Sequence, residues 1–145
     1  MTDSSVSASG RFLAAVVMLV VVSAIVGARL VTPSPQGVGT HEGLGLRPCS
    51  FLRWTSIPCP ACGGTTAFTL MARGRVREAL LTSPLGAATF AVLVVLLIPL
   101  ARIVTGRSSP LITQLLGRPV LLVRPIIGLT VVSWLVVILR LHVGN

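Results

Sequence analysis

Long apolar runs separated by short polar segments dominate the chain. Runs without any charged residue cover residues 12–28, 79–101 and 125–139, which are 17, 23 and 15 residues long. Because a helix needs about 20 apolar residues to cross a bilayer, the middle run predicts a complete span. The other two reach that length when a terminal arginine extends its guanidinium to the membrane surface. The pattern predicts an all-α integral membrane protein with about three transmembrane helices.

The first apolar run has a second interpretation. Residues 1–11 are polar with one arginine, and residues 26–28 resemble the small-residue cleavage site of a secretory signal peptide. Cleavage after residue 28 would leave a mature chain with two spans. The run is longer than the about 7–15 apolar residues of a usual signal peptide, so we favour an uncleaved anchor. With the N-terminus inside, five arginines lie inside and seven outside, and the positive-inside rule leaves the orientation open.

The segment 33–63 holds five prolines and several glycines, which predicts a loop. Thr65 or Thr66 can cap a helix that follows it, and Gly74 interrupts that helix. Its expected apolar face recurs every four residues, at Phe68, Ala72, Val76 and Leu80. We expect a broken amphipathic helix lying in the membrane interface. The alternative is a re-entrant segment that packs on the other helices.

These segments predict a single membrane domain over residues 1–145. Pro84 and Pro125 suit the first turns of the second and third spans, and Pro99 is expected to kink or end the second. The expected parts are span 1 or signal anchor (12–32), cysteine loop (33–63), interfacial helix (64–82), span 2 (83–101), a loop (102–119) and span 3 (120–141).

Composition excludes a soluble fold, because 53% of the residues are hydrophobic, only 10% are charged and the mean hydropathy is +0.94. All 12 basic residues are arginine, against three acidic ones. Beside apolar runs, these arginines favour contact with lipid headgroups over nucleic acid. The absence of lysine suggests a bacterial coding bias, so we expect a multi-pass protein of the bacterial cytoplasmic (inner) membrane. Three acids leave little for acid–base catalysis, so we name no catalytic residue and do not expect an enzyme.

The cysteines are confined to one loop, with Cys49, Cys59 and Cys62 spaced C-x9-C-x2-C. Two thiolates at C-x2-C can hold one tetrahedral ion, and a glycine after the second lets backbone N–H groups turn toward the sulfur atoms. Zinc takes four ligands in structural sites, and His41 is the histidine of this loop. One hypothesis is therefore a metal site, such as a zinc site, with Cys49, Cys59, Cys62 and His41 as ligands.

Two further hypotheses stay open for the same loop. Cys59 and Cys62 precede a predicted helix, whose N-terminus lowers the pKa of a nearby thiol, and Arg47 and Arg53 would help to hold a thiolate. The protein would then be a thiol–disulfide component of the membrane. Alternatively, it is a small scaffold or partner subunit of a membrane assembly or a homo-oligomer, with the motif only supporting the start of a helix.

A family resemblance appears over residues 49–85. The stretches that carry it are Pro48-Cys49, Cys59-Pro60-Ala61-Cys62-Gly63-Gly64-Thr65, Leu70-Met71-Ala72-Arg73-Gly74 and Pro84-Leu85. They resemble domain-of-unknown-function family 2752, small bacterial membrane proteins with a C-P-x-C-G-x-T-R motif. Thr66 stands where that motif has arginine, so this chain either lacks a contact made by that arginine or supplies it from Arg73 or Arg75. The family also has an N-P-L sequence ahead of an apolar helix, and Ser83 stands here in place of its asparagine. The resemblance implies a multi-span bacterial membrane protein and no particular reaction.

Overall fold

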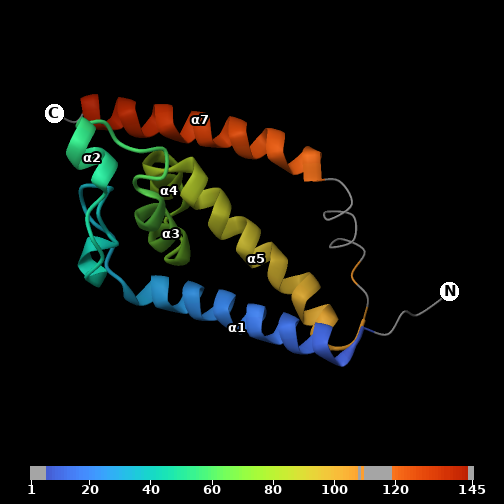
Figure 1. Ribbon diagram of the computed structural model, residues 1–145. Helices are drawn as coiled ribbons and strands as arrows, with labels where there is room; N and C mark the ends of the chain where they lie inside the picture. The colour runs from blue at the N-terminus through green and yellow to red at the C-terminus, as the bar shows by residue number, and fades with distance from the viewer. Residues whose placement is uncertain (1–5, 108, 110–118, 144–145) are drawn as a thin grey trace.

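The computed structural model describes residues 6–107, 109 and 119–143, and this part of the chain contains helices and no strand (Figure 1). Five residues at the N-terminus, two at the C-terminus and most of the expected loop at 102–119 lie outside the described residues. The helices are α1 (Ala8–Leu30), the 3-10 turn η1 (Glu42–Leu44), α2 (Ser50–Thr55), α3 (Gly64–Ala72), α4 (Val76–Thr82), α5 (Pro84–Val104) and α7 (Pro119–Val143).

Three of these helices are long and apolar enough to cross a bilayer: α1, α5 and the stretch Val123–Arg140 of α7. Their large apolar side chains point mostly outward. Leu19, Ile98 and Leu139, one from each helix, are all more than 60% exposed. Such surfaces are stable against lipid tails and not against water. The protein is thus an all-α membrane protein, as the apolar runs predict.

Figure 1 shows how the spans are arranged, with α1, α5 and α7 running back and forth. Helix α5 lies between the other two and packs on both. Helices α3 and α4 fill the space at one end of the bundle, where α3 contacts α1 and α5, and α4 contacts α5 and α7. The cysteine loop and α2 lie at this same end. We call it the cysteine end of the bundle.

The predicted break at Gly74 is confirmed. Gly74 has φ +76°, and its N–H donates to the carbonyl of Met71 at 3.0 Å. The N–H of Arg75 donates to the carbonyl of Leu70, also at 3.0 Å. This pair of bonds is a Schellman motif, which satisfies the last carbonyls of a helix and needs a left-handed residue that glycine supplies without strain. The predicted start is wrong, because the N-cap is Gly63 and not Thr65 or Thr66.

Beyond the break, the residue that packs inside the protein lies outside the expected apolar face. Val76 and Leu80 are about half exposed, whereas Ala79 is fully buried. The reason is that the turn at Gly74 resets the helical phase, so a four-residue spacing does not continue across it. The buried cluster consists of Ala67, Leu70, Ala79 and Ala87. Helix α3 therefore packs on the spanning helices, as the re-entrant alternative describes, and an interfacial position stays a prediction.

The predictions for the three helix prolines agree with the structure to different degrees. Pro84 is in the first turn of α5, as predicted, and the N-cap Ser83 accepts a hydrogen bond from the N–H of Gly86 at 3.3 Å. Pro125 lies inside α7, because that helix begins earlier, at Pro119. Pro99 does not end α5, which continues to Val104. Membrane helices tolerate internal proline where neighbouring groups satisfy the freed carbonyl.

We expect Gly86→Ala to destabilise the fold by about 1–3 kcal/mol, because overpacking forces neighbouring backbone apart. A Cβ at Gly86 would meet the carbonyl oxygen of Gly64 at 2.5 Å and the Cβ of Ala67 at 3.0 Å. Gly128→Ala is the matched control, since a Cβ on this helical glycine meets nothing within 4 Å. Thermal unfolding in detergent, followed by circular dichroism, measures both. Equal melting temperatures for the two variants would contradict the close approach of α3 to α5.

Candidate metal centre

Two short segments bring the cysteines together. Cys49 is the N-cap residue of α2, while Cys59 and Cys62 form a turn directly before α3. In that turn the N–H of Cys62 donates to the carbonyl of Cys59 at 3.0 Å. Gly63 then leaves the turn with φ +79° and begins the helix. The C-x2-C spacing therefore folds both sulfur atoms onto one side of a tight turn, facing Cys49.

The three Sγ atoms lie within 4.8 Å of one another. Cys62 Sγ is 3.0 Å from Cys59 Sγ and 3.7 Å from Cys49 Sγ. In a tetrahedral zinc site with Zn–S bonds of about 2.3 Å, the sulfur atoms are about 3.8 Å apart. The N–H of Cys59 also donates to Cys62 Sγ at 3.2 Å. All three cysteines are free thiols, and together they form a cluster that could hold one metal ion.

The cysteine thiols differ in burial and in pKa. Cys62 is 7% exposed, and desolvation raises its pKa to about 12. The lowered pKa expected for Cys62 at a helix start is therefore not found, because burial outweighs the helix end. Cys49 has a lowered pKa, chiefly because the backbone N–H of Leu52 stabilises its thiolate. Arg47 and Arg53 are both exposed.

A cavity of about 260 Å³ opens beside the sulfur atoms. His41 and Glu42 line it together with all three cysteines. The structure thus brings His41 to the same cavity as the cysteines, although it is not a member of the close sulfur cluster. Glu42 is a potential ligand that the sequence analysis did not name. Its position next to His41 in the sequence could have identified Glu42 as a candidate ligand.

Hydroxyl groups tie the segment before His41 to α3. Thr40 is 3% exposed, and its Oγ1 is 2.7 Å from Oγ1 of Thr66, which is 1% exposed. Thr40 Oγ1 also accepts a hydrogen bond from the N–H of Ser34 at 2.9 Å. Thr66 is thus a buried anchor for the loop. Arg73 donates to the carbonyl of Arg29 at 2.9 Å.

Gly63 marks where three segments meet. A Cβ at this position would be 2.8 Å from the carbonyl oxygen of Gly37 and 3.3 Å from that of Thr82. The cysteine turn is therefore held against both the preceding loop and the end of α4. Only glycine combines this close backbone approach with a left-handed φ.

The model of a family described as "Protein of unknown function (DUF2752)" matches residues 49–97. The similarity to this family is confined to these residues, and we call residues 49–97 the DUF2752 segment. It begins at Cys49, contains all three cysteines together with α3 and α4, and ends inside α5. No curated protein and no solved structure matches the chain.

A tryptophan outside the DUF2752 segment holds the segment in place. Trp134 of α7 donates its Nε1–H to the carbonyl of Pro58 at 2.8 Å, one residue before Cys59. Trp134 lies within the uncharged run 125–139, and the sequence alone does not identify a partner for its N–H. The available signal is that a tryptophan N–H surrounded by apolar groups needs an acceptor. The third span therefore helps to position the cysteine turn.

We expect Trp134→Phe to destabilise the protein by about 1–3 kcal/mol, because the carbonyl of the buried Pro58 loses its donor. Trp54→Phe is the control, since Trp54 is 90% exposed and should change stability by less than about 0.5 kcal/mol. Thermal unfolding in detergent compares the two. Equal destabilisation would show that the hydrogen bond from α7 to the DUF2752 segment contributes nothing.

Proposed function

We propose that the protein binds one transition-metal ion, such as zinc, through Cys49, Cys59 and Cys62. The observation that carries this proposal is the convergence of three sulfur atoms within 4.8 Å from two separate segments. Thiolate ligands favour zinc and other soft or borderline metals over magnesium or calcium. The ion has a structural or sensing role and does not perform catalysis.

His41 supplies the fourth ligand in this proposal. Structural zinc sites are closed by four protein ligands, and Cys₃His is a common set. The support is that His41 lines the cavity into which the three cysteines open. Thr40, next to it in the chain, is anchored to α3, which holds this part of the loop beside the cavity. Glu42 lies next to it at the same cavity.

Metal binding would require the thiols to release their protons. Three thiolates this close together repel one another, and a divalent cation would offset that repulsion. Binding would also link the start of α2 to the start of α3, so that metal affinity contributes to the stability of the loop. We place this site in a multi-pass protein of a bacterial cytoplasmic membrane, where a second copy or another membrane protein can respond to the loop.

The first test is elemental analysis of the full-length protein, purified in detergent under reducing conditions. We expect close to one metal ion per chain in the wild type. Cys59→Ser should lower the metal affinity by at least about tenfold, because it removes a ligand. Ala61→Ser is the matched control, since it adds a hydroxyl to the same exposed turn while keeping all three sulfur atoms. A metal-free wild type with all thiols reduced would overturn the proposal, and so would a disulfide between Cys59 and Cys62 in its place.

A second variant tests the fourth ligand. We expect His41→Ala to weaken binding and to change the absorption spectrum of the cobalt-substituted protein, because the spectrum depends on ligand type and geometry. Glu42→Gln is the control, since it retains size and removes only the charge of the neighbouring residue. An unchanged cobalt spectrum in His41→Ala would exclude His41 while leaving the three cysteines as ligands.

A further inference from the structure

A second cavity lies at the cysteine end of the bundle, away from the sulfur cluster. Its volume is about 440 Å³, within the range of about 300–1,000 Å³ that is usual for small-ligand pockets. The charged residues at its wall are Arg75, Glu78 and Arg140. Hydroxyl groups and apolar side chains complete the lining, at Ser34, Thr66, Thr82, Pro33, Pro35, Leu70 and Leu81.

Arg140 is held at this cavity by specific contacts. Its Nη1 donates to Oγ1 of Thr82 at 2.9 Å. Its guanidinium also lies over Gly37, where an added Cβ would collide with Nη1. Gly37 has φ +76°, so glycine both permits the local backbone and leaves the space that the guanidinium occupies. The side chain thus packs on the cavity wall instead of extending freely from the end of α7.

The two arginines of the cavity differ in charge balance. Arg75 is paired with Glu78 through two hydrogen bonds, one of them 2.7 Å from Nε to Oε1. Arg140 contacts a neutral hydroxyl, and within residues 6–107, 109 and 119–143 no carboxylate forms an ion pair with it. The cavity therefore carries one uncompensated positive charge, supported by hydroxyl groups able to donate to an anion.

The level of the cavity relative to the membrane indicates which kind of anion can reach it. Arg140 directly follows the uncharged run 125–139, and the polar end of an apolar run in a spanning helix lies at the level of the lipid headgroups. The apolar residues Leu70 and Leu81 border the same space, as suits the glycerol and first methylene groups of a lipid. Basic pockets between spanning helices at this level are suited to anionic headgroups.

We propose that this cavity binds the phosphate group of an anionic phospholipid, with Arg140 as the principal contact. The guanidinium offers a planar pair of donors to phosphate oxygens, and Ser34 and Thr82 lie close enough to complete the lining. This site is separate from the cysteine cluster, so the proposal stands or falls independently of metal binding.

The experiment measures binding to the full-length protein in a neutral detergent. The probes are short-chain phosphatidylglycerol, short-chain diacylglycerol and inorganic phosphate. We expect phosphatidylglycerol to bind and diacylglycerol to bind much more weakly. Inorganic phosphate that binds as tightly as the lipid, with the same dependence on Arg140, would overturn the lipid assignment while keeping the phosphate site.

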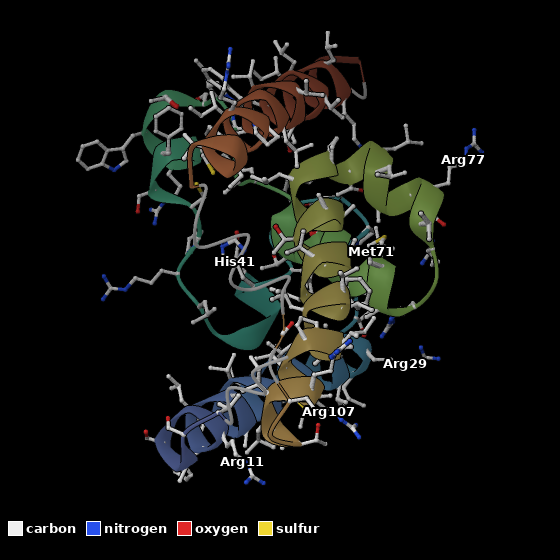
Figure 2. All side chains as sticks on the ribbon, turned by 90° about the vertical axis from the view of Figure 1, so that its right-hand side faces the viewer. Arg11, Arg29, His41, Met71, Arg77 and Arg107 are labelled. Atoms are coloured by element: carbon white, nitrogen blue, oxygen red, sulfur yellow. The ribbon has the colours of Figure 1, made fainter. Side chains whose placement is uncertain are left out.

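Arginine variants test whether this cavity is the site of phosphatidylglycerol binding. Arg140→Gln should weaken phosphatidylglycerol binding by at least about tenfold, the effect of losing a charged hydrogen bond. Arg77→Gln removes the same charge from α4 at the same end of the bundle, but Arg77 points away from the structure (Figure 2) and does not line the cavity. This control should bind within about twofold of the wild type. Equal losses in both variants would indicate nonspecific charge attraction and overturn the proposal.

A third variant keeps the test decisive if Arg140→Gln does not fold. Arg140→Lys retains the charge but loses the planar pair of donors, so it should fold and still bind more weakly than the wild type. Wild-type affinity in Arg140→Lys, with normal thermal unfolding, would overturn the assignment of Arg140 as the phosphate contact.

Discussion

The close packing of α3 against α5 depends on the absence of large side chains between them. Gly86 approaches the backbone of Gly64 so closely that no Cβ fits, and Ala67 and Ala87 are buried beside this contact. Small residues allow helix backbones to approach in membranes, where van der Waals packing replaces the hydrophobic effect. Because α3 begins directly after the cysteine turn, this contact also fixes where Cys62 lies. Helix packing, and not sulfur chemistry, therefore sets the position of the candidate site.

Several arginine side chains donate hydrogen bonds to the free backbone carbonyls at helix ends. Arg29 donates to the carbonyl of Ala72 at the end of α3, at 2.8 Å, and Arg73 donates in return to the carbonyl of Arg29 near the end of α1. Arg11 does the same for Val104 at the end of α5, at 3.1 Å. Free carbonyls at helix ends need partners, and an unsatisfied one costs more where water is scarce. Arginines that the sequence assigns to lipid headgroups thus also hold the helices together.

Local sequence patterns predict correctly what depends on neighbouring residues. The three spans follow from the lengths of the apolar runs, and the break between α3 and α4 follows from Gly74. The predictions fail where a distant contact intervenes. The thiol pKa of Cys62 is raised and not lowered because other segments bury it.

The sequence by itself determined that this is a helical membrane protein with its cysteines confined to one loop, because run length, proline and glycine are local signals. Only the tertiary structure decided which groups meet. Cys49 lies beside Cys62, Trp134 reaches the residue before Cys59, and Arg140 lies over the loop before the cysteines. These contacts join different helices and loops, and helical periodicity carries no information about which distant segment will pack against a given face.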